Sequence, residues 1–206
     1  MLLVIAGHNG AGKTTCYREY LQEVIAQHLD DHIDPDAIER EIRTDWLNDP
    51  VSDDEFSKMA SKEAERLRIM YLNNTTAFSM ETVLSDPVGD KLGFLQNALR
   101  SGYYVVLLAV GLDSPEKSIE RVSLRVARGG HDVNHDRIRN RYPRVLNNLS
   151  QAIGIVSLAL IVDNSQDNLE DGSGAYRAFA LFAHGDCIET ADNIPTWWSN
   201  VSAPTS

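Results

Sequence analysis

The sequence has only two cysteines, Cys16 and Cys187, and no apolar run that approaches the length of a membrane span. The cysteines are far apart and follow no metal-binding spacing, so neither a disulfide framework nor a cysteine-ligated zinc site is expected. A spanning helix needs about 20 apolar residues in succession, which excludes an integral membrane protein. The first apolar run starts at Leu2, which leaves no room for a signal peptide ahead of it. We therefore predict a cytoplasmic protein in a reducing compartment.

Basic residues are also scarce, with 19 lysines and arginines against 30 aspartates and glutamates and a net charge of −11. A general nucleic-acid-binding protein presents an excess of positive surface, so neither nucleic acid nor a membrane is an expected partner. A net charge far from zero keeps a protein soluble, and this is sufficient to explain the excess of acidic residues. The length of 206 residues suits one α/β domain. We predict a single domain over residues 1–198 and a disordered tail over 199–206.

The segment 7–14 reads Gly-His-Asn-Gly-Ala-Gly-Lys-Thr and fits the P-loop pattern Gly-x4-Gly-Lys-[Ser/Thr]. The apolar run 2–6 precedes it and a helical pattern over 15–25 follows, so the motif has the required context of strand, turn and helix start. Its glycines let successive N–H groups face phosphate oxygens, and the helix start adds partial positive charge. The residues expected to bind nucleotide are Gly7, His8, Asn9, Gly10, Ala11, Gly12, Lys13, Thr14 and Thr15.

Two side chains of the P-loop have predicted roles of their own. Lys13 is expected to reach the β- and γ-phosphates, and the Thr14 hydroxyl is expected to ligate Mg²⁺. ATP and Mg²⁺ are therefore the expected cofactors. The alternative is a chance glycine turn, but average residue usage produces this pattern in only about one chain in a hundred of this length.

Two acidic positions follow in the chain. Pro35 disfavours helix at Asp34 and starts a new helix, which puts Asp36 in the first turn. Asp34 has a structural explanation as a cap, and Asp36 is either a favourable charge at a helix start or a catalytic carboxylate. Glu81 and Thr82 lie near the end of a strand predicted over 77–84, where active sites of parallel sheets lie; the alternative is an edge position facing water.

Seven arginines and no lysine fall between residues 121 and 144. Arg121, Arg125 and Arg128 share one helix face, and Arg137 and Arg141 repeat the spacing in a second helix after Gly129-Gly130. Clustered guanidinium groups repel one another, so two such faces predict a lid that closes on phosphates. The alternative is a solvated basic face balanced by acidic neighbours.

The remaining pattern predicts an α/β fold. Apolar strands alternate with helices, which indicates a P-loop kinase-like parallel sheet with helices on both faces and an arginine-rich helical lid at about 115–150. Ser52 and Glu55 have the spacing of a capping box. The runs 175–183 and 186–190 suit a final hairpin, although the first suits a helix equally well.

Several segments together resemble the zeta-toxin family of bacterial toxin–antitoxin kinases. They are residues 6–15, 33–38 and 81–85, Arg121-Val122-x2-Arg125-Val126-x2-Gly129-Gly130-His131-Asp132-Val133, Arg137-x3-Arg141-Tyr142, and Asp163-Asn164-Ser165. The likeness runs in order from residue 2 to about 165. Many kinases share the P-loop, whereas the arginine and Gly-Gly-His stretch is far more specific to zeta-like proteins.

The resemblance implies an ATP-dependent kinase, which in toxic members phosphorylates UDP-N-acetylglucosamine on its sugar, and it implies an antitoxin as a possible partner. By position, Asp36 matches the catalytic base and Glu81 a substrate-binding carboxylate. One arginine of each helix matches the catalytic lid pair, and we take these to be Arg125 and Arg141. The other residues assigned on this basis are Thr82, Arg121, Arg128 and Arg137 for substrate, Lys13 for catalysis and Asn164 near the adenine.

The sequence departs from the family at two positions. Asp34 stands where Asn often precedes the Pro-Asp pair, and Asn134 stands where a Pro commonly follows His-Asp-Val. Two other classes therefore stay open. One is a different small-molecule kinase, such as an antibiotic phosphotransferase. The other is a non-catalytic ATP-binding switch, against which the presence of Asp36 argues.

Overall fold

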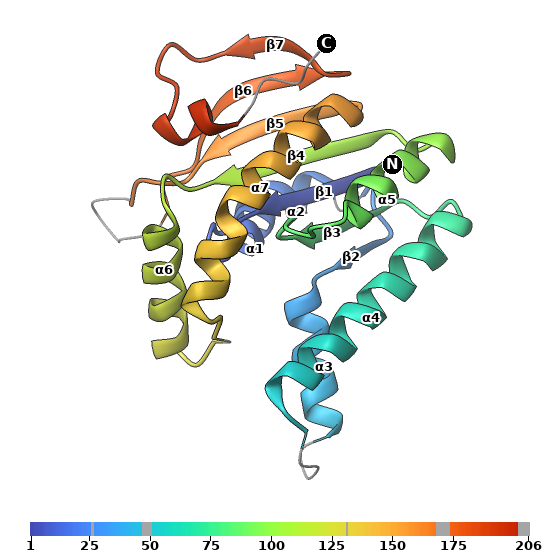
Figure 1. Ribbon diagram of the computed structural model, residues 1–206. Coiled ribbons are helices and arrows are strands. Elements are labelled where there is room, and N and C mark those ends of the chain that lie inside the picture. The colour runs from blue at the N-terminus through green and yellow to red at the C-terminus, as the bar shows by residue number, and fades with distance from the viewer. Residues whose placement is uncertain (26, 47–50, 131, 168–173, 202–206) are drawn as a thin grey trace.

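The computed structural model describes residues 1–25, 27–46, 51–130, 132–167 and 174–201 (Figure 1). Within them, seven strands form one sheet in the order β2-β3-β1-β4-β5-β6-β7. Strands β1 to β5 are parallel to one another, whereas β6 is antiparallel to β5 and β7 antiparallel to β6. The strands are β1 (Leu2–Gly7), β2 (Asp31–Ile33), β3 (Phe78–Thr82), β4 (Val105–Gly111), β5 (Leu158–Asp163), β6 (Arg177–Ala183) and β7 (Asp186–Thr190).

The predicted parallel sheet thus accounts for five strands, and the predicted C-terminal hairpin adds two antiparallel ones. The helix after the P-loop is continuous but contains a π-helical segment, η1, between α1 and α2. No helix among the described residues is both long and apolar enough to cross a bilayer. The helices are α1 (Lys13–Cys16), η1 (Tyr17–Leu21), α2 (Gln22–Ile25), α3 (Pro35–Asp45), α4 (Asp53–Asn73), α5 (Asp90–Arg100), α6 (Pro115–Ala127), α7 (His135–Ile155) and the 3₁₀ helix η2 (Thr196–Asn200).

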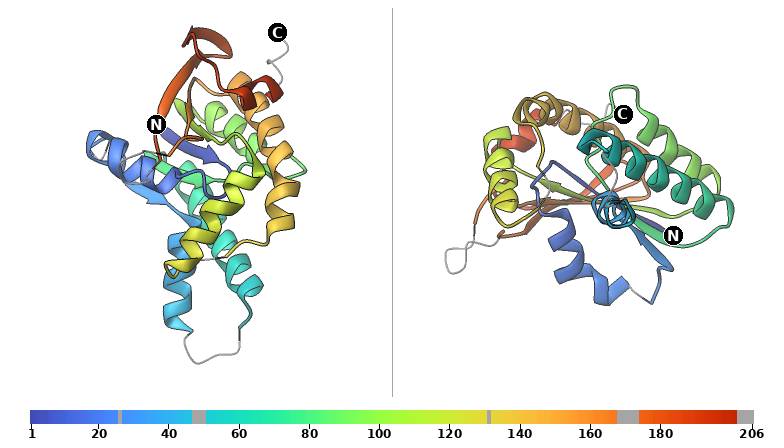
Figure 2. Two further views of the ribbon diagram at one scale, coloured as in Figure 1. Left: turned by 90° about the vertical axis from the view of Figure 1, so that its left-hand side faces the viewer. Right: turned by 90° about the horizontal axis from the view of Figure 1, so that it is seen from below.

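Two hydrophobic cores lie on opposite faces of the sheet. Successive residues of a strand point to opposite faces, so Leu3 and Ile5 of β1 join one core and Val4 the other. The first core packs beneath α1, η1 and α2, and the second packs beneath α4, α5 and α7. The right-hand view of Figure 2 shows these two groups of helices on either side of the sheet. The predicted arrangement of helices on both faces is confirmed.

Local signals fix where the helices around the site begin. Asp34 caps α3, accepting a hydrogen bond from the Asp36 amide at 2.9 Å, and Pro35 is the first helical residue. Ser52 and Glu55 form both halves of the predicted capping box at the start of α4. α3 and the start of α4 run side by side and project from the sheet (Figure 1).

The C-terminal segment packs back against the sheet. Trp197 is 1% exposed, and its indole Nε1 donates to Asp163 Oδ1 at 2.9 Å. A Cβ at Gly111 would lie 2.1 Å from the Trp197 ring, so only glycine permits this contact. Ser199 and Asn200 belong to η2, and Val201 is buried. The described structure therefore includes three residues beyond the predicted domain boundary at 198, and residues 202–206 lie outside the described residues.

Candidate active site

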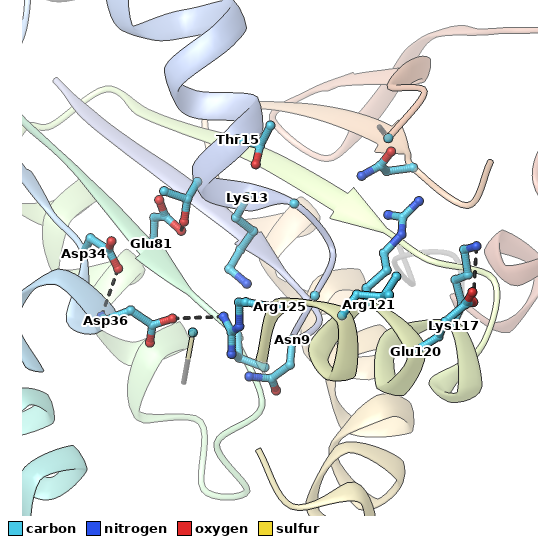
Figure 3. Close-up of a pocket in the computed structure, with 18 of the residues that line it drawn as sticks. Asn9, Lys13, Thr15, Asp34, Asp36, Glu81, Lys117, Glu120, Arg121 and Arg125 are labelled. Carbon is cyan, nitrogen blue, oxygen red and sulfur yellow. Dashed lines mark hydrogen bonds and ion pairs between the residues drawn. The ribbon is translucent and has the colours of Figure 1, made fainter. Parts of the chain in front are cut away.

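A cavity of about 650 Å³ opens at the carboxyl ends of the parallel strands (Figure 3). Its walls come from the P-loop, the start of α3, the end of β3, one face of α6 and the segments around Asn164 and Tyr176. The residues predicted from the sequence that line it are Asn9, Gly10, Gly12, Lys13, Thr14, Thr15, Asp36, Glu81, Thr82, Arg121, Arg125, Arg128 and Asn164. The predicted residues that do not line it are Gly7, His8, Ala11, Arg137 and Arg141.

β4, Asn164 and Tyr176 contact the P-loop backbone and shape it. Gly7 lies so close to β4 that a Cβ there would be 2.2 Å from the Val110 carbonyl oxygen. The Asn164 side-chain amide donates to the Ala11 carbonyl at 2.9 Å, and the Tyr176 hydroxyl donates to the Gly12 carbonyl at 2.8 Å. Gly12 has a φ of 85°, which favours glycine. Gly7 and Ala11 therefore shape the loop without lining the cavity.

Lys13 reaches into the part of the cavity where Asp36, Glu81 and Arg125 converge (Figure 3). Its Nζ donates to the carbonyl oxygens of Gly7 at 3.2 Å and His8 at 3.0 Å. Burial lowers the pKa of Lys13, and the charges of Glu81 and Asp36 partly oppose that shift. The ammonium group is thus held by carbonyls at the place where phosphate oxygens would compete for it.

Glu81 is buried at the end of β3 and faces the P-loop. The Thr14 hydroxyl donates to Glu81 Oε2 at 2.9 Å. Thr82 is also buried, and its Oγ1 accepts from the Leu84 amide at 3.1 Å. The alternative of an edge position facing water is excluded, because β3 lies between β2 and β1.

Asp36 and Asp34 have different surroundings. The Asp36 carboxylate is exposed, lines the cavity and lies 3.3 Å from the Arg125 guanidinium. Asp34 is buried as the α3 cap, and burial, followed by the charges of Glu81 and Asp36, raises its pKa. A carboxylate that accepts a proton from a substrate must be reachable from the cavity, and Asp36 meets that requirement.

One face of α6 forms a wall of the cavity. The lining residues of this helix and its C-cap recur at helical spacing: Lys117, Glu120, Arg121, Leu124, Arg125 and Arg128. Protein carboxylates partly neutralise this face. Arg121 pairs with Asp167 at 2.6 Å, and Lys117 pairs with the same carboxylate. Figure 3 shows Lys117 and Arg121 nearer the N-terminal end of α6 than Arg125.

α7 contacts the outer side of the P-loop. The Tyr142 ring stacks on His8 with centroids 4.3 Å apart, and Arg141 donates to Asn9 Oδ1 at 3.4 Å. Burial lowers the pKa of His8 to about 3, so the imidazole is neutral. Burial, followed by the positive charges of Arg137 and Arg144, lowers the pKa of Arg141 to about 10. Arg137 itself is exposed. The two predicted arginine faces therefore do not both meet the cavity.

A sequence model of the zeta toxin family matches residues 1–169. The chain belongs to the zeta toxin family. A Haemophilus influenzae relative, described as an uncharacterized protein, is 29% identical over 137 residues, which is 66% of this chain and 88% of the relative.

Solved structures share the fold of this zeta toxin family member. AvrRxo1-ORF1:AvrRxo1-ORF2 with sulphate ions has a TM-score of 0.74 at 15% identity over 100% of this chain and 65% of that chain. The same complex with ATP also has a TM-score of 0.74 at 15% identity, over 100% and 64%. The PezAT toxin–antitoxin system of Streptococcus pneumoniae has a TM-score of 0.52 at 24% identity, over 85% and 69%. The chain thus spans slightly less than two thirds of the AvrRxo1 chains.

The residues of this zeta toxin family site that the sequence did not indicate include Lys117, Asp167 and Tyr176. Lys117 lies one turn before Arg121 on the same helix face, so extending the arginine spacing backwards would have found it. Asp167 follows Asn164 closely, but nothing in the sequence indicates its two basic partners. Tyr176 stands in a segment without periodicity, and no sequence signal points to it.

The residues present fit both a nucleoside triphosphate and Mg²⁺. Within the described part of the chain, no cluster of three or more His, Cys, Asp or Glu residues would hold a metal alone. Mg²⁺ commonly keeps several waters and binds one or two carboxylates together with substrate phosphates. The Thr14 hydroxyl and the Glu81 carboxylate supply such a donor set beside Lys13.

Proposed function

We propose that this zeta toxin family protein is an ATP-dependent kinase that transfers the γ-phosphate to a hydroxyl of a small acceptor. The observation that carries the proposal is the convergence of Lys13, Asp36 and Arg125 at one end of the cavity. These are a phosphate-binding cation, an accessible base and a second cation, which are the groups that phosphoryl transfer requires.

Each side chain has a separate task in the proposed reaction. Lys13 binds the β- and γ-phosphates after leaving the carbonyls of Gly7 and His8. Asp36 accepts the acceptor hydroxyl proton as the bond to phosphorus forms. Arg125 stabilises charge on the transferred phosphoryl group. When bound at Thr14 and Glu81, Mg²⁺ supplies charge neutralisation at the phosphates.

The ion pair between Arg125 and Asp36 connects two of these tasks. In the structure their atoms are 3.3 Å apart, so the guanidinium covers the carboxylate that is proposed to act as base. Binding of the γ-phosphate gives Arg125 a more highly charged partner. The Asp36 carboxylate is then released to meet the acceptor hydroxyl.

The proposed acceptor is a nucleotide-sugar such as UDP-N-acetylglucosamine. Arg128, the C-cap of α6, lines the cavity and offers a cation for an acceptor phosphate, and Glu81 and Thr82 offer hydrogen-bonding groups. Arg137 lies outside this lining, so its proposed role in substrate binding has less support. The PezAT and AvrRxo1 structures are described as a toxin–antitoxin system and a two-protein complex, which supports an antitoxin as a proposed partner.

The test incubates the purified protein with labelled ATP and a panel of nucleotide-sugars. Asp36→Asn is nearly isosteric and should retain ATP binding while lowering transfer by roughly 10²–10⁴-fold. Lys13→Ala should weaken ATP binding by about tenfold or more, as measured by calorimetry. Full transfer by Asp36→Asn would refute the base, and unchanged ATP affinity in Lys13→Ala would refute the P-loop assignment. ATP binding by wild type without transfer to any acceptor would favour a switch protein.

A further inference from the structure

Glu81 is a buried carboxylate with two different neighbours. Its Oε2 accepts from Thr14 at 2.9 Å, while its Oε1 lies 3.5 Å from His32 Nε2. The Glu81 side chain is 5% exposed and that of His32 21%. A buried carboxylate is costly unless compensating donors surround it. His32 lies on the opposite side of Glu81 from the P-loop and takes no part in the reaction described above.

The position of His32 follows from the sheet register. His32 of β2 is the register partner of Ser79 of β3, so the two side chains lie on the same face of the sheet. Glu81 is two residues beyond Ser79 on β3 and shares that face. The imidazole Nδ1 is 2.7 Å from Ser79 Oγ, and the ring stacks on Tyr17 with centroids 3.9 Å apart and planes 6° apart.

These contacts restrain the imidazole on two sides. Tyr17 belongs to η1, the π-helical part of the helix that follows the P-loop. Segments of π-helix are frequent at functional sites, and this one holds Tyr17 against the ring. The ring is therefore fixed in plane by Tyr17 and in rotation by Ser79.

The carboxylate that faces the ring favours one placement of the ring proton. Ser79 Oγ is 2.7 Å from His32 Nδ1 and 3.4 Å from the Asp31 carbonyl oxygen, so its single hydrogen serves one of the two. An ionised carboxylate only accepts hydrogen bonds, which favours the proton on Nε2, with Nδ1 accepting from Ser79. His32 Nε2 and Glu81 Oε1 lie 3.5 Å apart, and neither atom makes a hydrogen bond with the part of the chain that the structure describes.

We propose that His32 is a positioning residue that holds the Glu81 carboxylate toward Thr14 and the Mg²⁺ of bound nucleotide. This inference rests on the proposed Mg²⁺-dependent nucleotide site. Outer partners of metal ligands fix ligand orientation, and losing one commonly reduces metal affinity or activity by roughly 10–100-fold. His32 acts through Glu81 and touches neither substrate.

Two substitutions separate the polar contact between His32 and Glu81 from the ring stack on Tyr17. His32→Phe keeps an aromatic ring against Tyr17 but removes the donor, whereas His32→Gln keeps an amide donor near Nε2 but removes the ring. His28→Phe is the matched control, because His28 is exposed and lies outside the cavity lining. Calorimetry measures ATP affinity for each variant in Mg²⁺ and in EDTA, and thermal melting checks that each is folded.

His32→Phe should lose about tenfold or more of the affinity that Mg²⁺ adds, with ATP affinity in EDTA unchanged. His32→Gln should retain most of the Mg²⁺ effect, and His28→Phe all of it. In a Glu81→Gln background, His32→Phe should add no further loss, because Glu81 is the group through which His32 acts.

Wild-type Mg²⁺ dependence in His32→Phe would overturn the inference. Equal loss in the Phe and Gln variants would also overturn it, since the ring stack would then be the important contact. Wild type that shows no Mg²⁺ effect on ATP affinity would overturn it too. The measurement of ATP affinity needs no acceptor and is therefore independent of the transfer assay. Failure to transfer phosphate to any acceptor would reject the proposed function without deciding the role of His32.

Discussion

Asp34 and Asp36 are separated by one proline, yet one is buried and the other exposed. Both residues line the cavity, but Asp34 is buried as the cap of α3, whereas the Asp36 carboxylate is exposed. The burial of Asp34 raises its pKa, and the charges of Glu81 and Asp36 raise it further. The folded protein therefore holds a proton on Asp34 more tightly than the unfolded chain does. Stability is then lost as the pH rises from the ordinary aspartate pKa through the folded value.

Asp34→Asn is expected to raise the melting temperature at pH 7. Asparagine keeps the oxygen that accepts from the Asp36 amide and removes a charge that is repelled by Glu81 and Asp36. The stability gain should shrink as the pH falls below the ordinary aspartate pKa, where the wild-type group is neutral. Thermal melts across pH measure this.

Asp192→Asn, at an exposed position, is the control for the loss of one negative charge. A gain from Asp34→Asn that did not change with pH would contradict the electrostatic explanation. Phosphoryl transfer should survive Asp34→Asn, in contrast to Asp36→Asn.

Single residues of the site were predictable where a motif defines a local geometry. The P-loop pattern placed Lys13 and Thr14, and the proline-set helix start placed Asp36. The contact between Thr14 and Glu81 was not predictable, because it depends on β3 lying next to β1 in the sheet. His32 was missed for the same reason, since its function depends on register with Ser79 and its strand has only three residues.

At the scale of elements, α6 and α7 differ more than their matching arginine patterns suggest. α6 supplies a wall of the cavity, and α7 packs on the back of the P-loop through Tyr142 and Arg141. Gly129 has a φ of 85°. Its amide donates a hydrogen bond to the Val126 carbonyl, and the Gly130 amide donates to the Arg125 carbonyl, which ends α6. The Gly-Gly pair thus forms a helix stop that reverses the chain into α7. Sequence spacing identified the faces but not which elements they would meet.

Arg125→Ala and Arg141→Ala are each expected to lower kcat by about 10²-fold or more, with smaller changes in the KM for ATP. Arg125 acts from the cavity wall, and Arg141 acts from its contact with Asn9. Steady-state kinetics with the identified acceptor measures both.

Arg139→Ala is the control, because Arg139 pairs with Glu116 and Asp136 and lies outside the cavity lining. Near-normal kcat in both test variants would show that neither arginine takes part in catalysis.

At the scale of the whole molecule, the C-terminal segment completes the second core. Trp197 packs edge to face on Phe179 with centroids 5.6 Å apart and lies against Gly111 at the end of β4. The sequence predicted a domain that extends to residue 198 and so includes Trp197. It did not indicate the partner, because the glycine that admits the indole is distant in the chain.

Trp197→Ala is expected to lower the free energy of unfolding by about 3–5 kcal/mol, because it removes a fully buried indole and leaves a cavity. Trp46→Ala is the same change at a side chain that is 43% exposed, and it should have a much smaller effect. Urea denaturation measures both. Equal effects of the two substitutions would show that the C-terminal segment adds nothing to the core.

The sheet order also sets when the P-loop can take its final shape during synthesis. β1 and the P-loop are synthesised first, but β1 lies between β3 and β4, and both emerge much later. The P-loop carbonyls are held by Asn164 and Tyr176, which are synthesised long after the loop itself. At roughly 5–20 residues per second, a nascent chain spends many seconds carrying every P-loop residue without the folded sheet that shapes the loop. The P-loop geometry described above is therefore completed only after Tyr176 has been synthesised.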